Sequence, residues 1–181
     1  MTSVRERFAQ LSTTRQSSTR FVTVTMSASE GLHIGLSGRG RDRHDETSLA
    51  AEIEQTVTAA EEQYFTTLAE LTEQLARERG ISGRPRPSTP LSEPPGVDEL
   101  MGHAVSGGGH VEVVALVGRV LFITFHRNAV RRPDLPTSAL EAEVNEAIGA
   151  ARRELAATGR QLRIAMRRQA TPTSSPSPTT D

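Results

Sequence analysis

The sequence predicts an α+β fold of two ββα modules, because one pattern of strands and helix occurs twice in the chain. Apolar residues at five strand positions recur 89 residues later, and those at five helix positions recur 91 residues later. The strand matches pair Val22, Val24, Leu32, Ile34 and Leu36 with Val111, Val113, Leu121, Ile123 and Phe125. The helix matches pair Leu49, Ile53, Val57, Ala60 and Tyr64 with Leu140, Val144, Ile148, Ala151 and Leu155. Such internal repetition predicts an intramolecular pseudo-dimer with a shared antiparallel sheet and long packed helices.

Composition divides the chain into five segments. Residues 1–20 are rich in Ser, Thr and Arg, so we expect a partly helical or disordered N-terminal segment. Residues 21–79 and 101–170 hold the two ββα modules, and residues 80–100 between them have the Gly and Pro content of a linker. Residues 171–181 consist of Pro, Ser, Thr and Asp, so we expect a disordered tail.

Residue periodicity supports the elements of the first module. Apolar residues alternate with Thr, His and Gly over 22–26 and 32–36, which predicts two half-buried strands. A long helix is expected from about Ser48 to Glu78. Its apolar stripe repeats at close to 3.5 residues, which favours packing against another helix.

The second module is more apolar. Strands are expected at 111–117 and 120–125, and both of their faces carry apolar residues, so we expect both faces to be covered. A helix follows from about Ser138, because Ser138 and Glu141 have the spacing of a capping box.

Several functional classes are disfavoured by what the sequence lacks. The chain has no cysteine, so disulfides, thiolate metal sites and a cysteine nucleophile are excluded. The five histidines lack paired ligand spacing, and the serines lack a GxSxG context. We therefore expect no metal, no cofactor and no enzymatic activity. No leader-like or membrane-length apolar run is present, so we expect a cytoplasmic protein without a membrane partner.

The charge pattern directs attention to arginine. The chain has no lysine and 21 arginines. Each arginine guanidinium is a planar, forked group that suits a phosphate or a carboxylate. The formal net charge is −1, so nucleic-acid binding would depend on local patches. With only six aromatic residues, single-strand recognition by base stacking is disfavoured.

Three groups of arginines are the candidate DNA-binding residues. Two groups follow the second strand of each module, and a third stands against one acid, Glu154, between residues 150 and 170. The groups are Arg39, Arg41 and Arg43; Arg127, Arg131 and Arg132; and Arg152, Arg153, Arg160, Arg163, Arg167 and Arg168. Basic loops at related points of two modules could contact two stretches of duplex backbone. The alternative for every group is an ordinary solvated surface.

Two further features have competing interpretations. The first long helix is rich in glutamate, which indicates a solvated face or else pairing with the basic second helix of this or another chain. Gly107, Gly108 and Gly109 could cradle an anion, but no Lys-Ser/Thr pair follows and a strand comes next. We therefore expect a flexible entry to the strand at these glycines.

The order of sequence motifs along the chain resembles that of the YbaB/EbfC family. The resemblance lies in the glycine-rich entry at 105–109, the Val111-Glu112-Val113 strand, the second strand at 121–123 and the helix from Leu140 to Ala151. The first module matches more loosely, through 22–25, 31–34 and the helix from Leu49. That family usually carries one module per chain, whereas this chain carries two.

The resemblance implies a function as well as a fold. Family members are small nucleoid-associated proteins that bind DNA as homodimers, and divergent actinobacterial relatives are associated with type VII secretion loci. A YbaB-like pseudo-dimer would bind double-stranded DNA through arginine–phosphate contacts, largely independent of sequence, and would be nucleoid-associated. The alternative is a protein–protein adaptor or secretion-associated cytosolic factor that retains the fold without binding DNA. Either function leaves the long helices available to pair with a second copy or another protein.

Overall fold

The computed structural model of the chain describes residues 3–80, 100–117 and 121–170, with the last six as backbone only. The segments predicted as linker and tail lie mostly or wholly outside these residues. The first half contains α1 (Val4–Ala9), β1 (Ser12–Gln16), β2 (Val22–Ser27), β3 (Gly31–Leu36), the short 3-10 helix η1 (Arg41–Arg43) and α2 (Glu46–Glu78). The second half contains β4 (Met101–Val105), β5 (Val111–Leu116), β6 (Leu121–Phe125) and α3 (Thr137–Ala170).

The strands form two separate three-stranded antiparallel sheets, in the orders β1-β2-β3 and β4-β5-β6. The α+β class and the two predicted strands of each half are confirmed. The single shared sheet is wrong for the described strands, since no β-ladder joins β3 to β6. Each sheet also has one strand more than predicted, because β1 and β4 precede the expected pairs.

The two added strands have weak sequence patterns. In β1 the buried residue is Thr13, and in β4 it is Gly102, so neither strand shows apolar residues on its inner face at alternate positions. Both nevertheless extend the internal repeat, because Thr13 and Gly102 are again 89 residues apart. Ser17 and Ser106 keep the same offset, and each hydroxyl accepts a hydrogen bond from the first amide of the next strand at 3.1 Å.

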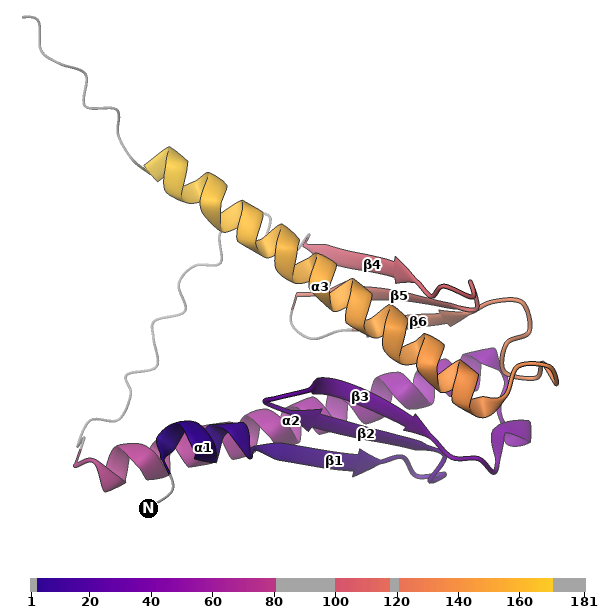
Figure 1. Ribbon diagram of the computed structural model, residues 1–181, viewed down its shortest axis with the longest axis horizontal. Helices are drawn as coiled ribbons and strands as arrows, with labels where there is room; N and C mark the ends of the chain where they lie inside the picture. The colour runs from indigo at the N-terminus through magenta and orange to yellow at the C-terminus, as the bar shows by residue number, and fades with distance from the viewer. Residues whose placement is uncertain (1–2, 81–99, 118–120, 171–181) are drawn as a thin grey trace, which may run out of the picture.

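Each long helix covers its own sheet and also reaches one strand of the other sheet. Helix α2 packs on β1, β2 and β6, whereas α3 packs on β4, β5 and β3. Figure 1 shows both helices starting at the same end of the molecule and diverging toward the other end. The expectation that the helices pack chiefly along each other is therefore wrong, because their apolar stripes face strands instead.

Side chains from these helices occupy the sheet edges where a shared sheet would have formed. The amide of Ile34 in β3 donates to Asn145 Oδ1 at 2.8 Å, and Asn145 Nδ2 donates to the Ile34 carbonyl at 2.7 Å. The amide of Ile123 in β6 donates to Glu54 Oε1 at 2.7 Å. Ile34 and Ile123 are matched positions of the repeat, and so are Glu54 and Asn145.

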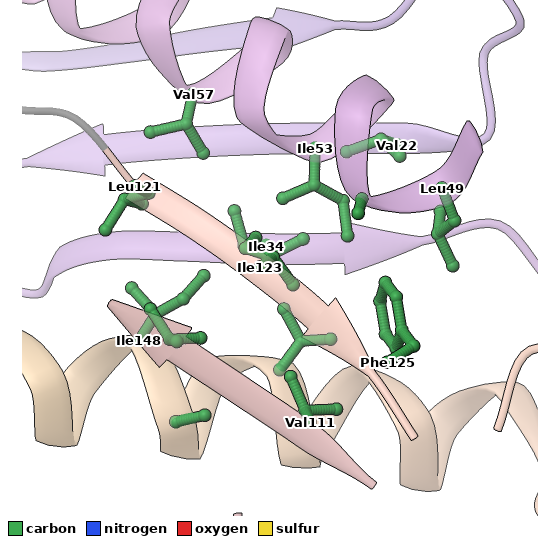
Figure 2. Close-up of a cluster of buried hydrophobic side chains, with 14 of the residues drawn as sticks. Val22, Ile34, Leu49, Ile53, Val57, Val111, Leu121, Ile123, Phe125 and Ile148 are labelled. Carbon is green, nitrogen blue, oxygen red and sulfur yellow. The ribbon is translucent and has the colours of Figure 1, made fainter. Parts of the chain in front are cut away.

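One hydrophobic core spans both halves of the chain. Fully buried Val22, Ile34 and Ile53 from the first half belong to the same cluster as Val111 and Ile148 from the second. Figure 2 draws this cluster, with Ile34 and Ile123 near its centre and Ile53 and Ile148 reaching it from the two helices. Most apolar positions of the repeat therefore bury their side chains against the other half of the chain as well as their own.

The outer faces of the two sheets differ in polarity. The outer face of the first sheet carries Ser, Thr and Gln on β1 and β2. On the second sheet Met101, Val105 and Phe122 are 54%, 49% and 51% exposed. The expectation that both faces of the second pair of strands are covered is wrong within the described residues, because α3 and the core cover only the inner face.

Candidate nucleic-acid interface

The structure brings two of the three predicted arginine groups to one end of the molecule. The first arginine loop, residues 37–45, joins β3 to α2, and the second arginine loop, residues 126–136, joins β6 to α3. Both loops lie where the long helices begin (Figure 1). They line a common open cleft of about 980 Å³ to which Arg39, Arg41, Arg131 and Arg132 contribute.

Local sequence explains why the first loop turns into a helix at this point. Gly40 has φ of 98°, a backbone conformation that glycine adopts without steric cost, and η1 follows it. Asp45 then caps α2 by accepting from the Ser48 amide at 2.8 Å, while the Ser48 hydroxyl accepts from the Asp45 amide at 2.9 Å. The Ser48 hydrogen bonds lower the pKa of Asp45.

Arg41 is half-buried and bound to the second arginine loop. Its Nε donates to the Val130 carbonyl at 2.6 Å, and its terminal nitrogens donate to the carbonyls of Leu135, Ala129 and Arg132. Burial lowers the pKa of this guanidinium. Because its donors are used on backbone carbonyls, Arg41 joins the two loops. We therefore do not expect it to bind DNA phosphates.

Arg132 and Arg131 are partly engaged. Arg132 forms a two-pronged contact with Asp134, at 2.7 and 2.8 Å, and this carboxylate raises the pKa of the guanidinium. Its third contact is with His110 Nε2 at 3.2 Å. Arg131 is exposed and makes one long hydrogen bond, 3.5 Å from Nε to the His44 carbonyl.

Arg39, Arg43 and Arg127 are exposed cations at this end of the molecule. The side chains of Arg39 and Arg43 make no polar contact with another described residue, and that of Arg127 makes a single long one, 3.4 Å to the Gly108 carbonyl. Arg127 and Asn128 have φ of 57° and 60°, so a tight left-handed turn presents the Arg127 side chain. Together with Arg131, these side chains form the loop cluster: Arg39, Arg43, Arg127 and Arg131.

The third predicted group lies elsewhere, along the C-terminal half of α3. With a rise of 1.5 Å per residue, Arg160 lies about 35 Å along the helix from its start at the arginine loops. Arg153, Arg160 and Arg163 are exposed and have no polar partner among the described side chains, whereas the Arg152 guanidinium pairs with Glu61 of α2. The side chains of Arg167 and Arg168 lie outside the described part of the structure.

The glycine-rich turn binds carboxylates of its own chain. The Gly107 amide donates to Glu146 Oε2 at 3.1 Å, and the His110 amide donates to Glu143 Oε2 at 3.3 Å. A Cβ on Gly108 would overlap the Glu143 carboxylate. The Gly107 and His110 amides are thus occupied by glutamates, and this turn is anchored on α3 where the sequence indicated a flexible strand entry.

His44, His103, His110 and His126 each lie beside a glutamate, which spacing along the chain does not reveal. Buried His44 stacks on Phe21 with ring centroids 4.7 Å apart, and its Nδ1 lies 3.4 Å from Glu52. His103 and His126 flank Glu112 at 2.7 Å each. These hydrogen bonds lower the pKa of Glu112. Among the described residues, no three potential ligands are grouped so that they could hold a metal ion.

Ser106, His110 and Glu143 meet, but in an order that differs from a nucleophile–base–acid relay. Both the Ser106 hydroxyl, at 2.5 Å, and His110 Nδ1, at 2.8 Å, contact Glu143. His110 Nε2 faces Arg132 and not the serine. In a catalytic triad the histidine must contact the nucleophile. Here the glutamate joins the other two side chains and fixes the β4–β5 turn to α3.

Comparison with known proteins gives no match for this chain. No protein-family profile, no curated protein and no solved structure matches it. Within residues 3–80, 100–117 and 121–170, no helix combines the length and apolar character needed to cross a lipid bilayer.

Proposed function

We propose that the chain is a non-catalytic, nucleoid-associated type of protein that binds double-stranded DNA largely without sequence preference. The proposal is carried by the loop cluster, in which four exposed arginines from two loops lie at one end of the molecule. Arginines on loops meet phosphates more readily than base edges, so binding of this kind is electrostatic. The sequence resemblance to the YbaB/EbfC family supports the same function.

We also propose that the two halves are a YbaB-like pseudo-dimer related by an approximate two-fold axis. Reciprocal contacts support this, since α2 reaches β6 while α3 reaches β3. The hydrogen bonds at the sheet edges are reciprocal too. Glu54 accepts from the Ile123 amide, and its counterpart Asn145 accepts from the Ile34 amide. Glu52 and its counterpart Glu143 each accept a hydrogen bond from a hydroxyl in the β1–β2 or β4–β5 turn.

A contact between two equivalent positions of the repeat supports the proposed two-fold axis. Glu61 of α2 and Arg152 of α3 occupy the same position of the repeat, 91 residues apart, and they form an ion pair with each other. In a symmetric dimer, a residue that touches its own copy lies on the two-fold axis. The pair therefore marks the place where such an axis would pass between the two helices.

An alternative function has one observation in its favour. The outer face of the second sheet exposes Met101, Val105 and Phe122, and groups of exposed apolar side chains mark interaction sites. The net charge of −1 also gives the whole molecule no general attraction to DNA. A protein–protein adaptor would use this apolar face and leave the arginine loops as solvated surface.

Fluorescence anisotropy with a labelled duplex of mixed sequence separates the two functions. At about 50 mM salt, we expect micromolar protein to bind, and replacing Arg39, Arg43 and Arg127 by Gln to weaken binding about tenfold or more. The matched control replaces three exposed arginines at the opposite end, Arg5, Arg77 and Arg79, and should bind like the wild type. A folded protein that fails to bind, or equal losses in both variants, would refute the DNA proposal and favour the adaptor.

A further inference from the structure

We propose that the free edge of β1 pairs with β1 of a second copy of this chain, so that the two first sheets join into one six-stranded antiparallel sheet. The inference is independent of DNA binding. It rests on a comparison of the four sheet edges: which of them have backbone groups that are hydrogen-bonded to a helix side chain, and which do not.

The outward-facing groups of β1 follow from its ladder with β2. The Ala28 amide donates to the Leu11 carbonyl at 3.2 Å, and the Ser17 amide donates to the Val22 carbonyl at 2.9 Å. In an antiparallel ladder these hydrogen-bonded positions alternate, so odd-numbered residues of β1 face β2. The amides and carbonyls of Ser12, Thr14 and Gln16 therefore face away from the sheet.

The other three edges each receive a side chain from a long helix. On β3, Asn145 contacts both backbone groups of Ile34, and Glu141 accepts from the Leu36 amide at 2.7 Å. On β6, Glu54 accepts from Ile123. On β4, Glu154 accepts from the outward amide of His103 at 2.8 Å.

The matched positions in the first half lack this cap. Thr14 corresponds to His103 and Gln63 corresponds to Glu154, by the offsets of the repeat. Gln63 is exposed, and its side chain makes no hydrogen bond with another described residue. Of the four edges, β1 alone has no helix side chain on its outward amides within the described part of the chain. Figure 1 shows it as the outermost strand of its sheet.

A second copy of β1 fits this edge in a self-complementary register. A two-fold axis at Thr14 places Thr14 opposite Thr14 and Ser12 opposite Gln16, so each of the three outward residues meets an outward residue. Each such pair exchanges two hydrogen bonds. The register also places Arg15 opposite Thr13 of the other copy, which avoids direct opposition of like charges.

The side chains on this edge favour a second copy over a foreign peptide. Strand addition gains specificity from pockets for alternate side chains of the peptide. The outward residues here are short hydroxyls and one amide, which form no such pocket but tolerate an identical strand. Five-residue strands bury less than a standard interface of about 1,600 Å², so we expect a weak dimer with a dissociation constant on the order of 100 µM.

The test uses a substitution that removes one outward donor. Thr14→Pro deletes an amide that takes no part in the β1–β2 ladder, and proline is tolerated on edge strands. Thr14→Ala is the matched control, because it loses the same hydroxyl and keeps the amide. Sedimentation velocity of the full chain across about 5 to 500 µM should show dimers for wild type and Thr14→Ala, with association at least tenfold weaker for Thr14→Pro.

Two further measurements keep the outcome decisive. Thr14→Pro could also destabilise the fold, which a lower melting temperature than that of Thr14→Ala would reveal. In that case hydrogen exchange of the wild-type amides takes the place of the variant comparison. The amides of Ser12, Thr14 and Gln16 should then become more protected as the protein concentration rises. Phe122→Ser should leave dimerisation unchanged. The proposal is overturned if the wild type stays monomeric in sedimentation or if the two Thr14 variants associate equally. It is also overturned if hydrogen exchange of the three amides does not change with protein concentration, or if only Phe122→Ser abolishes the dimer.

Discussion

Gly102 lies where β4 crosses α3 so closely that the strand has no room for a side chain. A Cβ at this position would overlap the Ala151 carbonyl oxygen and lie 2.5 Å from the Leu155 amide nitrogen. Both atoms belong to the backbone of a long helix, so neither can move aside as a flexible side chain would. The close contact explains how β4 packs on α3 although its inner face carries only Gly102 and Ala104.

Gly102→Ala should therefore lower the free energy of unfolding by about 3 kcal/mol, because overpacking against backbone forces the two elements apart. The matched control is Gly35→Ala in β3, where the nearest atom to a new Cβ is 3.8 Å away. We expect the control to change stability by less than about 1 kcal/mol. Urea titration of both variants measures the difference, and similar losses would contradict the assigned contact.

Glu143 provides a pH-dependent contribution to stability. Burial would raise the pKa of this carboxyl, but hydrogen bonds from Ser106 and His110 outweigh it and hold the pKa below its usual value. An unfolded Glu titrates at about 4.3. A carboxyl whose folded-state pKa is depressed stabilises the fold above the unfolded pKa, and this contribution is lost as pH falls through the folded-state pKa.

Glu143→Gln should accordingly flatten the fall in melting temperature between about pH 5 and pH 3, since the amide cannot take up the proton. The control is Glu30→Gln, because Glu30 is exposed and its carboxylate has no polar partner among the described residues. Thermal melts at a series of pH values measure both. The same acid slope in wild type and Glu143→Gln would show that the Ser106–His110–Glu143 contacts do not contribute.

The elements were predictable where apolar residues recur at a regular period. The four strands β2, β3, β5 and β6 and both long helices follow from such patterns. Strands β1 and β4 could not be found in this way, because Thr13 and Gly102 occupy their buried inner positions. Likewise, the 3.5-residue stripe of α2 favours a helix partner, but a sequence alone does not reveal that strands of two sheets fill that face.

The two long helices are joined electrostatically at one buried point. Glu61 is 3% exposed, and its Oε2 is a buried polar atom without a hydrogen-bond partner among the described residues. Its other carboxylate oxygen pairs with Arg152, which is about one-third exposed. Removing the cation leaves an almost fully buried carboxylate without compensation, which costs more than the pair itself contributes.

Arg152→Met should thus destabilise the protein by about 2 kcal/mol, a value reduced from the usual cost of breaking a buried pair because Arg152 is partly solvated. Adding Glu61→Gln should restore part of this loss, because it removes the stranded charge. A double-mutant cycle by denaturant titration measures the coupling. Strictly additive effects would show that the two residues do not interact, and would weaken the case for an axis between α2 and α3.

At the scale of the whole molecule, the candidate site was partly predictable. Sequence position shows that both arginine loops follow the last strand of a module, and the structure brings these loops together. It could not show that Arg41 would be used on the carbonyls of the second loop, or that Arg132 would pair with Asp134. The Arg41 contacts join residues far apart in sequence, whereas the Arg132–Asp134 pair depends on the conformation of the second arginine loop. The third group stays on α3, away from the loops.

Salt dependence would show how many of these arginines neutralise phosphates. If DNA binds at the loop cluster, log Kd should vary linearly with log salt, and the slope should flatten by about 0.9 for each phosphate that an arginine no longer neutralises. We expect the Arg39, Arg43 and Arg127 variant to flatten the slope. The corresponding Gln variant at Arg153, Arg160 and Arg163 measures the separate contribution of α3. A slope unchanged in the loop variant would mean that the loops do not neutralise phosphates.

The shared core has a consequence for how the protein loses its structure. Val22 and Ile53 from one half and Val111 and Ile148 from the other belong to a single buried cluster, so opening either half would expose apolar surface of both. A half-unfolded intermediate is consequently high in energy, even though the same apolar pattern occurs twice along the sequence. Heating should give one calorimetric peak whose van't Hoff and calorimetric enthalpies agree, and proteases should find no long-lived fragment that corresponds to one repeat.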